Sequence, residues 1–82
     1  MARELDFALA FAVVHELPAA NHFFVEIAEA LVPGACLLLV EPKGHVNTEE
    51  FDAELQAAAQ AGLALADRPA ISRSRAALLR KA

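Results

Sequence analysis

An apolar run at residues 35–40 (ACLLLV) most constrains what this chain can fold into. Pro33 and Gly34 precede the run, and Glu41 and Pro42 follow it. An apolar run of strand length between turn residues is typical of a strand that is buried on both faces of a sheet. We therefore expect this strand to lie at the centre of an α/β sheet. Ligands of open α/β sheets bind at the carboxyl ends of such strands.

A second candidate strand covers residues 5–14, where large and small apolar residues alternate. Neither of its faces is polar after Asp6, so this strand also needs cover on both sides. An amphipathic helix is expected next, with Asn21 as its N-cap and Pro33-Gly34 at its end. Its apolar side chains fall on one helical stripe: Ala20, Phe23, Phe24, Ile27, Ala28 and Leu31.

Asn47 and Glu50 predict the start of a second helix, because their side chains can form a capping box. Gly62 is placed to cap its end, and two short strands, residues 63–66 and 76–79, complete a β-α-β-α-β-β pattern. Parallel crossovers are right-handed, so both helices should cover one face of the sheet and leave the other face bare. The apolar stripe expected for the second helix comprises Phe51, Leu55, Ala58 and Ala59.

The composition narrows the class of protein. The 82 residues suffice for one domain, yet 57% of them are hydrophobic, above the roughly 45–50% of soluble domains. This excess suggests burial against another chain. A net charge of −4 argues against a nucleic-acid partner, and no apolar run reaches the length of a membrane span. The single cysteine, Cys36, and the lack of a signal-peptide layout favour a cytoplasmic location.

Four short segments in order carry a family resemblance. FVEI at residues 24–27 leads into LVPGA at 31–35, which is similar to an L-x-P-G-G entry to a fifth strand. The strand ending in Glu41-Pro42 and the AGL segment at 61–63 match as well. From about residue 5 to residue 79, the chain resembles the carboxy-terminal half of class I S-adenosylmethionine-dependent methyltransferases.

The resemblance implies a partial Rossmann-like fold in which residues 1–82 form one half-domain. Its four-stranded mixed sheet would have the order 4-5-7-6 in family terms, with the last strand antiparallel and two helices on one face. The family's glycine-rich turn and its ribose-binding acidic residue lie upstream of the matched part. Gly34, Gly44 and Gly62 are scattered without G-x-G spacing, so no cofactor is expected for the isolated chain. S-adenosylmethionine is expected only if a partner completes the domain.

Polar side chains follow both central strands. His15 and Glu16 come after the first, and Glu41, Lys43 and His45 come after the second. The loop after strand four lines the methyl-transfer site in the family, so the resemblance implies His15 and Glu16 as candidate catalytic residues. His15 could act as a general base, and Glu41, Lys43 and His45 are candidate ligand-site residues. The alternative is that these are ordinary residues at strand ends.

Two other chemistries remain open at these strand ends. A metal site from His15, Glu41 and His45 has suitable ligand types, although the spacing is not that of a tight site, so no metal residues are assigned. Lys43 could instead hold an anion near the start of the second helix, because the helix dipole favours negative charge there. A solvated turn lysine is the simpler interpretation.

Three functional hypotheses follow. The first is a truncated methyltransferase-like protein without activity on its own, stabilised as a homodimer through the bare sheet face or the edge of strand 5–14. The second is one subunit of a split S-adenosylmethionine-dependent methyltransferase completed by another chain. The third is a small-ligand or metal-binding module that uses the strand-exit loops. The sequence does not identify a methyl acceptor.

Overall fold

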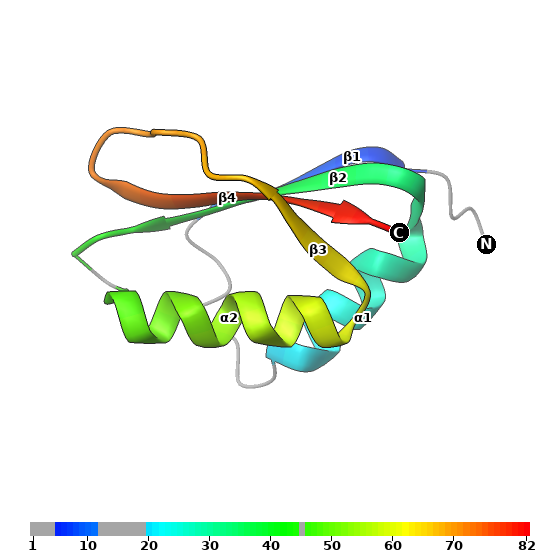
Figure 1. The fold of residues 1–82 in the computed structure, drawn as a ribbon, viewed down its shortest axis with the longest axis horizontal. Coiled ribbons are helices and arrows are strands. Elements are labelled where there is room, and N and C mark those ends of the chain that lie inside the picture. Colours follow the sequence, from blue (N-terminus) through cyan, green and yellow to red (C-terminus); the bar gives the residue numbers. More distant parts are fainter. Residues whose placement is uncertain (1–4, 12–19, 45) are drawn as a thin grey trace.

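The computed structural model describes residues 5–11, 20–44 and 46–82, which form a four-stranded sheet and two helices (Figure 1). Their order along the chain is the β-α-β-α-β-β order that the sequence predicts. The bounds are β1 (Leu5–Phe11), α1 (Ala20–Ala30), β2 (Leu31–Pro42), α2 (Thr48–Gln60), β3 (Leu63–Asp67) and β4 (Ser74–Lys81). The last two strands are longer than predicted, and residues 12–14 of the first predicted strand lie outside the described residues.

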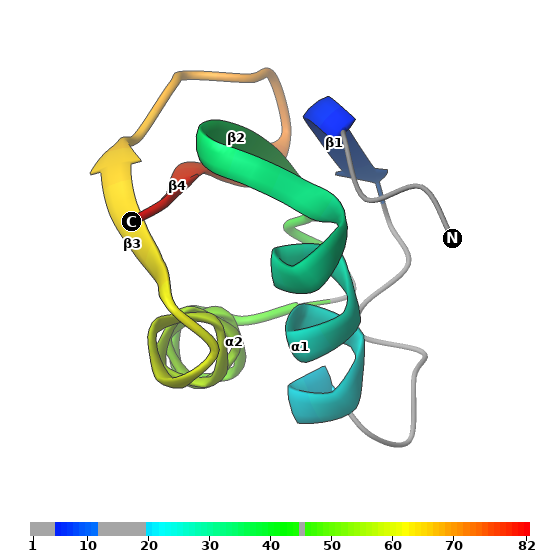
Figure 2. The same cartoon turned by 90° about the vertical axis from the view of Figure 1, so that its right-hand side faces the viewer.

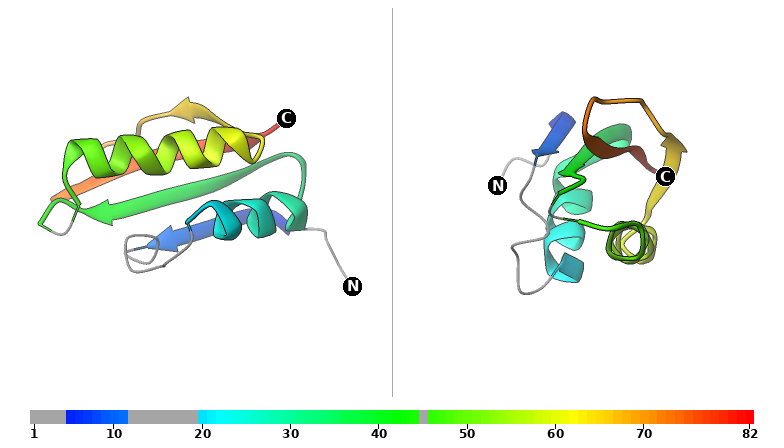
Figure 3. Two further views of the ribbon diagram at one scale, coloured as in Figure 1. Left: turned by 90° about the horizontal axis from the view of Figure 1, so that it is seen from below. Right: turned by 90° about the vertical axis from the view of Figure 1, so that its left-hand side faces the viewer.

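The sheet has the strand order β1-β2-β4-β3. β1 pairs with β2 in parallel, whereas β4 runs antiparallel to both of its neighbours, β2 and β3. Both helices lie on the same side of the sheet (Figures 2 and 3). The α/β class, the mixed sheet and the 4-5-7-6 order are therefore confirmed. Neither helix is long and apolar enough to cross a membrane within the described residues.

β2 begins earlier than predicted. It starts at Leu31, directly after α1, so the Pro-Gly dipeptide lies inside the strand instead of ending a helix. Leu5 pairs with Leu31 and Phe7 pairs with Cys36, which leaves extra β2 residues opposite a single β1 residue. This is a bulge, and Gly34 within it has a φ of 87°. Glycine adopts this left-handed conformation without the steric cost of a Cβ.

α1 begins at Ala20, so Asn21 lies inside its first turn and is not the N-cap that the sequence predicted. The predicted apolar stripe does face the sheet. Phe24 and Ala28 are buried, and the Phe23 ring packs edge-on against Phe24 with 5.4 Å between centroids. These contacts show that burial of an apolar stripe, rather than a cap at Asn21, positions this helix.

α2 begins where the sequence predicts. The Glu50 backbone N–H donates to Asn47 Oδ1 at 2.7 Å, and the Asn47 backbone N–H donates to Glu50 Oε1 at 2.9 Å. The two bonds form the predicted capping box. Gly62 follows the helix with a φ of 93°, also as predicted. Both ends of α2 are therefore encoded by local residues.

Replacing the cap of α2 gives a measurable expectation. Asn47→Ala should lower the free energy of unfolding by about 1 kcal/mol, because the N–H of Glu50 loses its acceptor. Asn21→Ala is the matched control, and it should leave stability unchanged or slightly higher, since alanine is the better residue within a helix. Urea unfolding of both variants tests this. Equal losses for the two would contradict the assignment of the caps.

The two faces of the sheet differ in how much of their apolar surface is buried. The helix-side core contains Leu37 and Leu39 of β2, Leu79 of β4 and the small side chain of Ala10 on β1, all of them buried. On the opposite face, the large side chains of β1 are exposed to between 44% and 60%: Leu5, Phe7, Leu9 and Phe11. The register places Cys36, Leu38 and Leu78, which are half-buried, on the same face. We call these seven residues the outer apolar face.

Candidate functional site

Two of the predicted site residues, Glu41 and Lys43, lie at the end of β2, where the strand leads towards α2. His15, Glu16 and His45 lie outside the described residues, so their roles stay predictions. Glu41 and Lys43 are described, and they take different positions. Glu41 is completely buried beneath α2, whereas Lys43 is exposed on the turn that follows β2. The strand exit therefore divides into a buried carboxyl site and a surface cavity.

Glu41 owes its burial to strand alternation. It follows Leu37 and Leu39 at two-residue intervals on the helix side of β2, and it pairs in register with Arg75 of β4. Its side chain forms a hydrogen bond with Glu54 of α2. A completely buried carboxylate needs partners, because removing its charge from water is costly.

Glu54 is the residue that the sequence analysis missed. It is 7% exposed, and its pKa is raised from 4.5 to about 8. Burial away from water is the largest cause, followed by the hydrogen bond to Glu41, the charge of Glu41 and the charge of Glu50. Glu54 is therefore protonated at neutral pH, and its hydroxyl donates to the Glu41 carboxylate. Its Oε1 has no hydrogen-bond partner among the described residues.

A signal for Glu54 did exist in the sequence. Phe51, Glu54 and Ala58 are spaced at i, i+3 and i+7, which places them on one face of a helix, and all three are buried. The predicted stripe included Ala59 instead, and Ala59 is exposed. The buried face of α2 is thus rotated toward Glu54, because that face meets Glu41 on the sheet.

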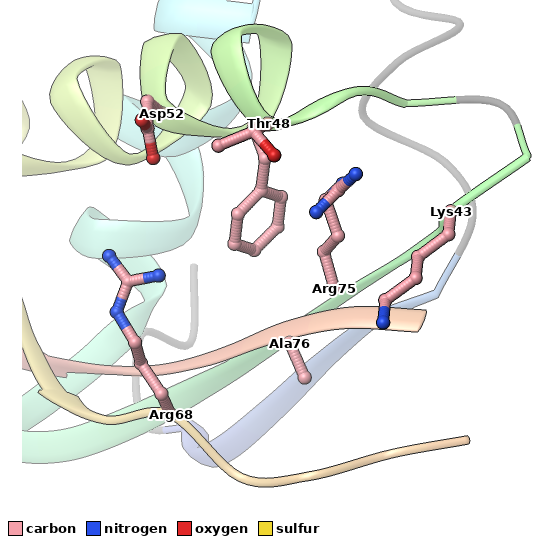
Figure 4. Close-up of a pocket in the computed structure, with 7 residues that line it drawn as sticks. Lys43, Thr48, Asp52, Arg68, Arg75 and Ala76 are labelled. Carbon is pink, nitrogen blue, oxygen red and sulfur yellow. The ribbon is translucent and has the colours of Figure 1, made fainter. Parts of the chain in front are cut away.

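A cavity of about 170 Å³ lies between the first turns of α2, the end of β2 and the start of β4. Figure 4 shows Arg68 and Arg75 reaching toward Thr48 and Asp52 of α2, with Lys43 at the β2 end of the cavity. Phe51 and Ala76 complete the lining.

The charges of this cavity favour an anion. Three cationic side chains and one carboxylate line it, in a chain whose net charge is −4. Arg75 is half-buried, and its Nε donates to the carbonyl oxygen of Val46 at 2.8 Å. Within residues 5–11, 20–44 and 46–82, no group of three or more His, Cys, Asp or Glu residues could hold a metal ion. His15 and His45, which belong to the alternative metal set considered from the sequence, lie outside the described residues.

Of the comparisons with known proteins, the one with solved structures gives a match. No protein-family model matches the chain, and no curated protein sequence is significantly similar to it. Among solved structures, the chain is similar to a crystal structure of a methyltransferase from Pyrococcus furiosus, with a TM-score of 0.62 and 15% sequence identity. The similarity covers 92% of this chain and 39% of that one, so the 82 residues span about two fifths of its length. The chain has a methyltransferase-like fold.

Proposed function

We propose that these 82 residues form a methyltransferase-like half-domain that has no methyltransferase activity by itself and is stabilised by pairing with a second copy. The outer apolar face carries this proposal. Its four β1 side chains are each about half exposed, and soluble monomers rarely leave contiguous apolar patches of several hundred Å² in water. The edge of β1 that faces away from β2, which no described strand pairs, adds a row of backbone groups that can pair.

The exposed area suits a second copy. A large apolar or aromatic side chain that is half exposed offers roughly 100 Å², so the four β1 side chains offer about 400 Å² per copy. Two such faces, together with the half-buried members of the patch, approach the roughly 1,000 Å² that a specific interface needs. An isologous dimer is the simplest closed arrangement for one self-complementary face.

Two features of the chain support its proposed lack of activity. The three glycines of the sequence have no G-x-G spacing, and a glycine-rich turn is what lets a backbone approach a nucleotide-like cofactor closely. The cavity of about 170 Å³ is also smaller than the roughly 300–1,000 Å³ of pockets that enclose drug-sized ligands. S-adenosylmethionine would exceed this cavity.

A second candidate function is a subunit of a split S-adenosylmethionine-dependent methyltransferase. One observation favours it, namely that the chain is similar to 39% of the Pyrococcus furiosus methyltransferase. In this case another chain, rather than a second copy, would cover the outer apolar face and supply the cofactor-binding half.

Sedimentation and calorimetry on the same preparation distinguish the two functions. We expect a dimer of twice the 8.7 kDa chain mass and no heat of binding with S-adenosylmethionine. Leu9→Asp should convert the dimer to a monomer, because Leu9 is the most exposed member of the face, at 60%. Val25→Asp is the matched control, since Val25 is an exposed apolar residue on α1.

Other results of the sedimentation and calorimetry experiments would lead to different conclusions. A stable monomer that binds no S-adenosylmethionine would reject self-association and favour completion by another chain. Binding of S-adenosylmethionine by the isolated chain would reject both candidates in their present form. A dimer that Val25→Asp dissociates as readily as Leu9→Asp would place the interface elsewhere.

A further inference from the structure

We propose that the cavity between α2 and the ends of β2 and β4 is a binding site for a phosphate group. Its cationic residues come from three separate segments: Lys43 from the turn after β2, Arg68 from the β3–β4 connection and Arg75 from β4. They are three of the seven Lys and Arg residues in an acidic chain. Asp52 is the one acidic residue among the described residues that line the cavity. Figure 4 shows the side chains around this space.

The site is held in place by the backbone. Arg75 Nε is anchored on the Val46 carbonyl, which fixes the plane of the guanidinium and leaves its terminal N–H groups for a ligand. The Lys43 backbone N–H donates to the Arg73 carbonyl at 3.0 Å and ties the turn after β2 to the β3–β4 connection. The segments that carry Lys43 and Arg75 are therefore positioned without any ligand. Preorganisation of this kind lowers the cost of binding.

The side chains of Lys43 and Arg68 are exposed. Among the described residues, no hydrogen bond or ion pair of the Lys43 or Arg68 side chain is present, even though both line the cavity with Arg75. In the first turn of α2, the Glu50 N–H is already used by the capping box. The anion would be bound mainly by side chains, with Arg75 as the fixed donor and Arg68 and Lys43 closing on it.

Charge and size select the ligand. Three positive charges and one negative charge leave a net charge of two, and a phosphate monoester carries about −1.5 to −2 at pH 7. A carboxylate brings a single charge and should bind more weakly. A volume of about 170 Å³ holds roughly six waters at about 30 Å³ each, which is enough for a phosphate group but not for a whole nucleotide. Any organic body attached to the phosphate would remain outside.

Titration by two-dimensional NMR at constant ionic strength tests the proposal, with inorganic phosphate, methyl phosphate and acetate as probes. We expect saturable shifts of the Arg75 Nε–H and the Thr48 amide with both phosphates, and weaker effects with acetate. Lys43→Ala and Arg68→Ala should each raise the Kd for phosphate about tenfold. Asp52→Asn should lower it, because the one repulsive charge is removed.

Arg80→Ala is the charge-matched control, since Arg80 is exposed on β4 outside the cavity and its loss changes the net charge equally. It should leave the Kd unchanged. Equal weakening by Arg80→Ala and Arg68→Ala would overturn the site in favour of diffuse attraction. Linear shifts without saturation, or equal binding of acetate, would also overturn it. Binding of inorganic but not methyl phosphate would confine the site to free phosphate. These outcomes do not depend on dimerisation or on S-adenosylmethionine.

Discussion

The Glu54→Gln variant should be about 4 kcal/mol more stable than the native chain near pH 9, and within about 1 kcal/mol of it near pH 5. Near pH 5 the native Glu54 is protonated, and its hydroxyl donates to Glu41 as the amide of glutamine would. Near pH 9 Glu54 loses its proton in the native chain. Two carboxylates then lie next to each other, with Glu41 wholly buried and Glu54 only 7% exposed. Glutamine avoids that repulsion.

The direction follows from linkage. The folded pKa of Glu54, about 8, lies above the ordinary value of 4.5, so the unfolded chain loses this proton first as the pH rises. The stability contributed by protonated Glu54 is complete below about pH 4.5 and is lost progressively up to about pH 8. Each unit of pKa difference between the folded and unfolded states changes the free energy of unfolding by about 1.4 kcal/mol.

Chemical denaturation across this pH range provides the measurement. Glu49→Gln is the matched control, because Glu49 is exposed in the first turn of the same helix and should show the native pH profile. A Glu54→Gln profile parallel to the native one would mean that Glu54 is ionised in the folded protein. That result would contradict the protonated carboxyl pair.

Phe24→Ala should be the most damaging of the simple core substitutions, with a loss of about 3–5 kcal/mol in the free energy of unfolding. Phe24 is completely buried between α1 and the sheet, so its removal leaves a cavity that the surrounding side chains cannot fill. Phe11→Ala is the same chemical change on the outer apolar face. There the ring is 56% exposed, and the loss in a single copy should be near 1 kcal/mol.

The pair of variants also reports on self-association. If two copies cover the outer apolar face, the loss caused by Phe11→Ala should grow with protein concentration, whereas that of Phe24→Ala should not. Thermal unfolding over a hundredfold range of concentration measures both. A larger loss for Phe11→Ala than for Phe24→Ala at high dilution would contradict the assignment of inner and outer faces.

Much of the fold was predictable because several of its elements are determined by residues that are close together in the sequence. The run at residues 35–40 specified a central strand, and the capping box of Asn47 and Glu50 specified the start of α2. The start of β2 was not predictable from such rules. A Pro-Gly pair can end a helix or form a bulge. Here the bulge forms because β2 pairs with β1, and this contact joins residues that are distant in the sequence.

The candidate site was predictable only in part. Glu41 and Lys43 were identified because they follow a strand. The neighbouring sequence does not indicate, however, that the Glu41 carboxyl group is buried and the Lys43 ammonium group is exposed. Glu54 was missed because an acidic residue on a helix is ordinarily solvated, and its burial depends on Glu41 across the helix–sheet interface. Nothing in the sequence connects Arg68 and Arg75 with Lys43, and only the sheet order brings them to the cavity at Lys43.

The strand order also constrains how the chain is made on the ribosome. β4 follows all other elements in sequence, yet it lies between β2 and β3 and bonds to both. While it is still being synthesised, β3 has no neighbouring strand, and β2 has β1 alone. Completion of the sheet therefore waits for β4, and until then β3 is unpaired and one edge of β2 is free. Vectorial synthesis thus leaves this small domain dependent on its final strand for cooperative folding.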